Sequence, residues 1–226
     1  MFAVLFEVHP KSDQWDAYLG HASRLRPELE QVEGFVDNIR YRSLNRDGWI
    51  LSLSIWQNEK AVVRWRTAKR HHEVQELGRE QVLEDYHLRV GQLSRDTKLP
   101  EGYELEEEEQ RLDETEVGEG TAVVLIDAKR SAEWKATDNP AECAEWLGLE
   151  PYQGFQDWDL FEAVLTPGDI LLMATFKDVA AAAEFEGSVT PPDEARLRRV
   201  HVIRDYGMHD RREAPQYYPE LKKSQE

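Results

Sequence analysis

The sequence predicts an α+β fold built from two tandem ferredoxin-like repeats, each with the element order β-α-β-β-α-β. Two observations lead to this fold class. The first part of the chain alternates β-type runs with longer helical patterns in this order, and the pattern returns after a strongly acidic stretch. When the chain is shifted by 120 residues, a strand, a turn and a helix superpose without a gap, which indicates a duplication.

Each element of the first repeat has its own sequence signal. His9-Pro10 ends a run of β-type residues, Asp47-Gly48 is a turn signal between two further runs, and Asn58 is placed to cap a long helix. The predicted elements are a strand, a helix, two strands, a second helix and a last strand, over residues 2–8, 12–32, 35–43, 49–56, 58–84 and 86–93.

The second repeat is shorter and altered. Asn139-Pro140 interrupts its first helix, and its second helix is followed by the prolines of 190–192. Between the repeats, the stretch PEGYELEEEEQRLDETEVGEG is rich in acids and poor in apolar residues, as is typical of a solvated linker. We therefore predict a first domain, an acidic linker, a diverged second repeat and an extended C-terminal arm, at residues 1–97, 98–120, 121–207 and 208–226.

Composition excludes several classes of partner. A net charge of −17 with no basic patch argues against nucleic acid. No apolar run approaches the roughly 20 residues that a membrane-spanning helix needs, so we expect no membrane partner. Cys143 is the single cysteine, so no disulfide can form within the chain, which favours a reducing, cytoplasmic location.

Strand alternation divides the side chains of the first repeat into two faces. We expect the almost wholly apolar set to lie under the helices: Phe2, Val4, Phe6, Phe35, Ile39, Tyr41, Trp49, Leu51, Leu53, Ile55, Tyr86, Leu88 and Val90. The opposite set is mixed: Leu5, Glu7, His9, Asn38, Arg40, Ser52, Ser54, Trp56, His87 and Arg89. Such a face usually meets a second sheet or encloses a ligand cavity, and the alternative is an ordinary solvated face.

The long helix adds a stripe that starts apolar and becomes polar. Helical spacing places Trp65, Ala68 and His72 on this stripe, while His71 points away from it. The two histidines lack the four-residue spacing that chelates a metal from a helix, so we expect no metal site. The candidate catalytic residues are His72, His87 and Arg89, and the candidate substrate-binding residues are Glu7, Asn38, Arg40, Ser52, Ser54, Trp56 and Trp65.

The segment IWQNEKAVVRW, followed by HHEVQELGREQVLEDYHLRV, resembles the antibiotic biosynthesis monooxygenase (ABM) family of dimeric α/β-barrel proteins. The resemblance covers about residues 1–95 and extends weakly to the second repeat. It implies a barrel of two ferredoxin-like sheets, closed either within one chain or by pairing of two chains in a homodimer. In this family, some members oxidise aromatic polyketides with molecular oxygen and no bound cofactor, relatives degrade haem, and others have no assigned activity.

The resemblance and the polar face together predict a monooxygenase that acts on an aromatic or quinol-type small molecule without a bound cofactor. Trp56 and Trp65 would stack on the ligand, Asn38, Arg40 and Arg89 would stabilise a phenolate, and His72 or His87 would remove the phenolic proton. The first alternative is a non-catalytic ligand-binding or assembly protein on the same fold.

The second alternative is a haem protein. The haem-degrading branch has an asparagine on the first strand and a histidine about ten residues after the helix tryptophan. Here these positions hold Glu7 and Gln75, and glutamine does not replace an axial histidine, so the sequence departs from that branch.

Overall fold

The computed structural model describes residues 1–106, 120–130, 139–150 and 154–211. In the first half it contains β1 (Phe2–Pro10), α1 (Trp15–Leu29), β2 (Phe35–Ser43), β3 (Ile50–Trp56), α2 (Glu59–Thr67), α3 (Lys69–Leu77), a π-helical turn (Gly78–Val82) and β4 (Leu83–Asp96). The second half contains β5 (Ala122–Lys129), α4 (Pro140–Trp146), β6 (Phe155–Ala163), β7 (Asp169–Phe176), α5 (Val179–Ser188) and β8 (Arg196–Gly207).

The eight strands form one closed barrel in the order β1-β3-β2-β6-β7-β5-β8-β4. Within each half the order is that of a ferredoxin-like sheet, and every pair is antiparallel. The halves join where β2 pairs with β6 and where β4 pairs with β8. The barrel therefore closes within one chain, and the predicted tandem ferredoxin-like arrangement is confirmed.

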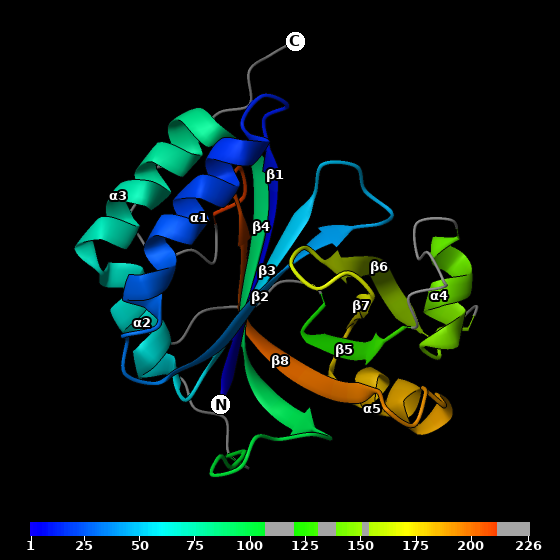
Figure 1. The fold of residues 1–226 in the computed structure, drawn as a ribbon. Helices are drawn as coiled ribbons and strands as arrows, with labels where there is room; N and C mark the ends of the chain where they lie inside the picture. Colours follow the sequence, from blue (N-terminus) through cyan, green and yellow to red (C-terminus); the bar gives the residue numbers. More distant parts are fainter. Residues whose placement is uncertain (107–119, 131–138, 151–153, 212–226) are drawn as a thin grey trace.

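The duplication is visible in the strand register. Phe35 pairs with Trp56 beside an irregularity in β2, and Phe155 pairs with Phe176 beside the same irregularity in β6. In Figure 1 the helices α1, α2 and α3 lie on the outside of the first half, and α4 and α5 lie on the outside of the second half.

The predicted second helix is not continuous. Asn58 does cap its start, since its side chain accepts a hydrogen bond from the backbone N–H of Ala61. The helix then breaks at Ala68, whose ψ of 126° is extended, and α3 begins directly afterwards. A π-helical turn follows over Gly78–Val82. Nothing in the sequence marks the break at Ala68, because alanine is the best helix former.

The pairing register also shows that the prediction divided the side chains of the first half-sheet wrongly between its two faces. Val4 lies directly opposite Ser54, and Phe6 lies opposite Ser52. Residues directly opposite each other in an antiparallel pair share a face, so the apolar side of β1 continues into the serine side of β3. The prediction put the β3 side chains on the wrong sides of the sheet, because neither of the two alternating sets of side chains in β3 carries a charge.

Parts of the predicted linker and arm contact the barrel. Leu99, Tyr103 and Leu105 pack against the core inside the barrel, and Met208 is buried. The rest of the linker (107–119) and of the C-terminal arm (212–226) lies outside the described residues.

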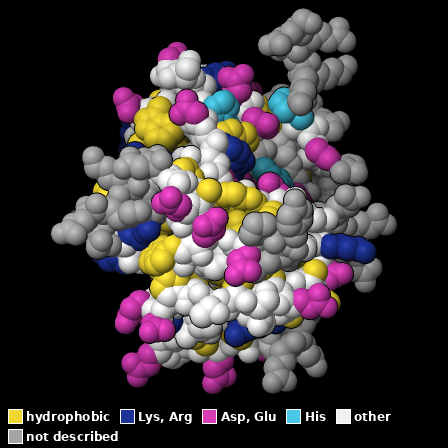
Figure 2. Space-filling model, turned by 90° about the vertical axis from the view of Figure 1, so that its right-hand side faces the viewer, with side chains coloured by type: hydrophobic (Ala, Val, Ile, Leu, Met, Phe, Trp, Pro, Cys, Tyr) yellow, Lys and Arg dark blue, Asp and Glu magenta, His cyan; other side chains and the backbone are white. Residues whose placement is uncertain are grey.

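None of the helices in the described part of the chain is long and apolar enough to cross a membrane. Acidic side chains are spread over the face in Figure 2, as expected from the net charge of −17.

Candidate active site

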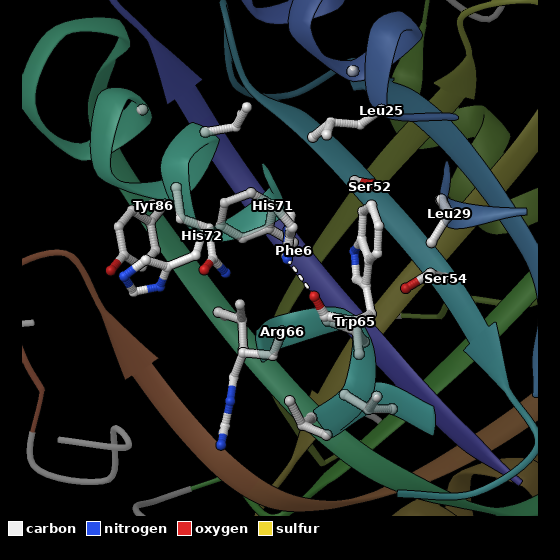
Figure 3. A pocket seen from close by; sticks show the side chains of 18 of the residues that line it. Phe6, Leu25, Leu29, Ser52, Ser54, Trp65, Arg66, His71, His72 and Tyr86 are labelled. Atoms are coloured by element: carbon white, nitrogen blue, oxygen red, sulfur yellow. Dashed lines mark hydrogen bonds between the residues drawn. The ribbon is translucent and has the colours of Figure 1, made fainter. Parts of the chain in front are cut away.

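A cavity of about 550 Å³ lies between the helices α1–α3 and the outer face of the first half-sheet (Figure 3). Its walls are mostly apolar and include Val4, Phe6, Leu25, Leu29 and Val90. The structure brings together most of the predicted site residues around this cavity: Asn38, Arg40, Ser52, Ser54, Trp56, Trp65 and His72. The strands β2 and β3 present five of these side chains to the helices, and α2 and α3 contribute Trp65 and His72.

Asn38 and the two serines form a polar strip on the floor of the cavity. The Asn38 amide nitrogen donates to Ser52 Oγ at 3.0 Å and to the Leu53 carbonyl at 3.2 Å. The carbonyl can only accept, so this contact fixes the orientation of the amide. Asn38 is 5% exposed, and its Oδ1 has no hydrogen-bond donor among the described residues. A buried, unsatisfied acceptor is costly unless a ligand or water donates to it.

Both serine hydroxyls keep a hydrogen to donate. Ser52 Oγ accepts from Asn38, and Ser54 Oγ accepts from the indole N–H of Trp56 at 2.9 Å. A hydroxyl that accepts still has its own hydrogen. The strip therefore offers two donors and one acceptor, which suits a neutral carbonyl or hydroxyl group on a ligand.

Arg40 lines the cavity at the edge of this strip, close to the side chain of Tyr18 on α1. Burial raises the pKa of Tyr18, and the neighbouring Arg40 opposes that rise, so the phenol stays neutral at physiological pH. Tyr18 was not predicted as a site residue, since the side of α1 that faces the cavity depends on how α1 crosses the sheet.

His71 lies in the cavity wall, although the sequence placed it away from the site. Its ring stacks on Trp65 with the centroids 4.3 Å apart, and its Nδ1 lies 2.9 Å from the Trp65 carbonyl oxygen (Figure 3). Burial lowers the pKa of His71 to about 4, against the effect of that hydrogen bond. The ring is therefore neutral, and because the carbonyl can only accept, Nδ1 carries the proton and Nε2 is an acceptor. The prediction failed because the helix breaks at Ala68, three residues earlier.

The charge of the lining is opposite to that of the whole chain. Six basic residues line the cavity: Arg40, Arg66, Lys69, Arg79, Arg204 and Arg211. Among the described lining residues there is one acid, Glu59, which pairs with Arg204 at 3.0 Å. In a protein of net charge −17, such a lining concentrates anions rather than cations.

Glu7, His87 and Arg89 do not line the cavity, so the prediction that they share it with Asn38 and His72 is wrong. The register places them on the opposite side of the sheet, facing the barrel interior, because Glu7 is paired with His87 and Leu51.

There Glu7 and Arg89 form a buried ion pair, and the half-exposed His87 lies next to it. Glu7 Oε1 accepts from Arg89 at 2.8 Å and lies 3.5 Å from His87, while Arg46 binds its other oxygen. Arg89 also donates to Thr175 of the second half. The network ties the two half-sheets together and has no access to the cavity lining.

The protonation states follow from these contacts. Burial alone would raise the pKa of Glu7, but Arg89, His87 and Arg46 hold it well below its usual range. Burial would lower the pKa of His87, but hydrogen bonds with Asp205 and Glu7 raise it to about 9. His87 is therefore an imidazolium near neutral pH, which is the wrong state for a general base.

The charged form of His87 is expected to make stability depend on pH. Its pKa is about 9 in the folded protein and about 6.5 when unfolded, so its contribution is complete below pH 6.5 and is lost as the pH rises through 9. Urea unfolding at a series of pH values should show this decline in the wild type and a flatter curve in His87→Gln. Parallel curves for the two proteins would contradict the assignment.

The equivalent positions of the second half are apolar and buried. Leu172, Ala174 and Leu160 occupy the positions of Ser52, Ser54 and Arg40, and they pack in one buried cluster with Phe176 and Phe185. Within the described part of the chain, no group of three or more His, Cys, Asp or Glu residues is placed to hold a metal ion.

Comparison with known proteins agrees with this architecture. The chain is a single-chain α/β barrel with a pocket under the helices of its first half, and the profile of the family "Antibiotic biosynthesis monooxygenase" matches residues 1–77. The chain is 47% identical over 225 residues to "Jasmonate monooxygenase ABM" of Pyricularia oryzae, and the match covers 97% of this chain and 99% of that protein. The chain belongs to the antibiotic biosynthesis monooxygenase family.

Two solved structures are also similar to the chain. One is described as an anthrone oxidase-like protein, at 12% identity and a TM-score of 0.36, with 95% of this chain and 96% of that chain covered. The other is a conserved protein from Methanosarcina mazei Go1, at 17% identity and a TM-score of 0.37, with 39% of this chain and 88% of that chain covered.

Proposed function

We propose that this protein is a monooxygenase that acts in the cavity on a small, mostly apolar organic acid of the jasmonate kind. The observation that carries the proposal is the cavity itself, whose walls are apolar and whose charged lining residues are basic apart from Glu59. Its volume of about 550 Å³ is in the range of small-molecule sites. The full-length relative named as a jasmonate monooxygenase supports this substrate class.

The polar groups of the cavity suit such a molecule. Jasmonate has an apolar body, one carboxylate and one ring ketone. The basic lining attracts the carboxylate, and the strip of Asn38, Ser52 and Ser54 offers hydrogens to a ketone oxygen. Trp65, Leu25 and Leu29 cover the apolar body from the helix side (Figure 3).

A monooxygenase reaction on such a substrate needs a reductant. One atom of molecular oxygen enters a C–H bond and the other becomes water, which consumes two electrons and two protons. A saturated carbon cannot supply these electrons, whereas a quinol or an anthrone can. The requirement for an added reductant therefore separates the two substrate classes.

An aromatic quinol-type substrate is the second candidate. Neutral His71 favours it, because its Nε2 can accept a hydrogen bond from a phenol in the cavity beside the Trp65 ring. His72 lines the same cavity and is the other candidate for that role. With this substrate class the reaction would need no bound cofactor, as the sequence resemblance implies.

Oxygen incorporation tests the proposal. The purified protein is supplied with isotopically labelled oxygen gas and either jasmonate or anthrone, with and without a reductant such as ascorbate, and products are analysed by mass spectrometry. We expect labelled hydroxyjasmonate only when reductant is present. Labelled product from anthrone alone would favour the second candidate, and no labelled product from either would favour a non-catalytic binding protein. A Soret band after haem addition would identify the haem alternative.

A further inference from the structure

Three donor side chains meet at the β4 side of the cavity: Arg79 from the π-helical turn, Tyr86 from β4, and Arg211 from the segment after β8. Both arginines donate to the Tyr86 hydroxyl oxygen, Arg211 at 2.6 Å. Each guanidinium also lies near a tyrosine ring, at 5.7 Å for Arg79 over Tyr86 and 5.1 Å for Arg211 over Tyr206. We call Arg79, Tyr86 and Arg211 the donor corner.

The donor corner offers hydrogens and almost no acceptors. A tyrosine hydroxyl has two acceptor positions and one hydrogen, and the two arginines occupy both acceptor positions, so the hydrogen is left to donate. Arginine only donates. The buried Nε of Arg211 has no acceptor in the described part of the chain, and no described carboxylate forms an ion pair with this residue. Such a group of donors is matched by an anion with several lone pairs, most simply a carboxylate.

The polar strip lies on the other side of the cavity. In the strand order β4-β1-β3-β2, Ser52 and Ser54 are two strands away from Tyr86, and Asn38 is three strands away. With a spacing of about 4.8 Å between strands, the two polar regions are roughly 10 to 14 Å apart. Figure 3 shows Tyr86 and His72 on one side and Ser52 and Ser54 on the other, with Phe6, His71 and Trp65 between them.

The polar strip is less suited to an anion than the donor corner. Asn38 directs an unsatisfied carbonyl oxygen there, and an acceptor facing a carboxylate is unfavourable. Arg40, the cation nearest to this strip along β2, lies close to the Tyr18 side chain. The two ends of the cavity thus differ in the ligand groups that they accept.

We propose that the donor corner holds the carboxylate of the substrate and thereby fixes its direction in the cavity. The apolar body then runs across β1, and its far end lies at Trp65, Ser52 and Ser54, where a neutral oxygen group is held. This inference rests on the proposed function only for the identity of the acid, because the donor corner should select acids over their neutral esters in any ligand that fits.

Calorimetric binding of matched acid and ester pairs tests the donor corner without turnover. The probes are jasmonate against methyl jasmonate, and octanoate against methyl octanoate, with the wild type and with Arg211→Gln, Arg79→Gln and Arg40→Gln. Lys60→Gln is the control, since Lys60 is an exposed cation on α2. Losing a hydrogen bond to a charged group should weaken acid binding about 10- to 100-fold in Arg211→Gln, leave ester binding within about 3-fold, and leave Lys60→Gln like the wild type. Arg211→Lys, which keeps the charge, should restore part of the preference for the acid.

Several results would overturn the inference. These are equal weakening of acid and ester in Arg211→Gln and Arg79→Gln, loss of the acid preference in Arg40→Gln instead, or a wild type that binds esters as tightly as acids. If the acid preference depends on Arg211 but no labelled oxygen enters jasmonate, the donor corner stands and the proposed function fails. If anthrone is oxygenated while no acid binds, the monooxygenase stands and the donor corner fails.

Discussion

Replacing Val74 by tryptophan is expected to reduce oxygenation at least about 100-fold while the protein stays folded. Val74 is half-buried on α3 and lines the cavity, so an indole at this position occupies space that the substrate needs. A displacement of the reacting atoms by about 1 Å can cost a factor of this size. The helix α3 has no fully buried residue, so it can shift outwards to accept the larger side chain.

The matched control is Glu76→Trp, which places the same side chain on the exposed face of the same helix. Turnover and thermal unfolding of both variants are measured under identical conditions. Near wild-type turnover in Val74→Trp would show that the reaction occurs outside this cavity. Equal loss in both variants would show that α3 responds to any bulky residue, and it would also contradict the prediction.

The Glu7→Gln substitution is expected to lower the free energy of unfolding by about 3–5 kcal/mol. Glu7 is 3% exposed and Arg89 is 4% exposed, and Glu7 is the carboxylate that both Arg89 and Arg46 bind. Removing its charge leaves the buried Arg89 without its carboxylate, which is the costly way to break a buried ion pair. Because the network faces the barrel interior, the affinity of the cavity for ligands should stay within about 3-fold of the wild-type value.

Urea unfolding measures this loss, and the double variant Glu7→Gln with Arg89→Met should recover part of it, because the unpaired charge is gone. The control is Glu30→Gln, which breaks the exposed pair of Glu30 with Arg26 and should cost less than about 1 kcal/mol. A loss of under 1 kcal/mol in Glu7→Gln, or a large change in its ligand affinity, would contradict the placement of Glu7.

Much of the fold could be predicted from the sequence because its signals are local and repeated. The run 35–43 is a strand with the predicted bounds, and Asn58 caps the helix that it precedes. The constant shift of 120 residues appears in the structure as equal pairing of Phe35 with Trp56 and of Phe155 with Phe176. A duplication preserves register, so comparing the two copies revealed information that neither copy carries alone.

The candidate site could be predicted only in part, because its composition depends on how strands pair. The sequence placed Asn38, Ser52 and Ser54 together, since β2 and β3 are joined by a short turn that fixes their register. The sequence does not show which β3 side chains share a face with which β1 side chains, because serine and aliphatic residues alternate in β3 and both sets are uncharged. Because of this ambiguity, Glu7 was predicted to lie in the site, whereas it faces the barrel interior.

Other site residues have no sequence signal. His71 enters the cavity because the helix breaks at Ala68, and no glycine or proline marks that break. Arg211 reaches Tyr86 across 125 positions of sequence, from a chain end whose composition predicts only an extended arm. Long-range contacts of this kind require the assembled barrel.

A crystal structure of the protein with bound jasmonate would locate the substrate in the barrel and show which groups hold its carboxylate. We expect electron density for the ligand between α1–α3 and the outer face of the first half-sheet, with its carboxylate at Arg79, Tyr86 and Arg211. Density in the barrel interior beside Glu7 and Arg89, or an empty cavity in a crystal grown with saturating jasmonate, would contradict this expectation.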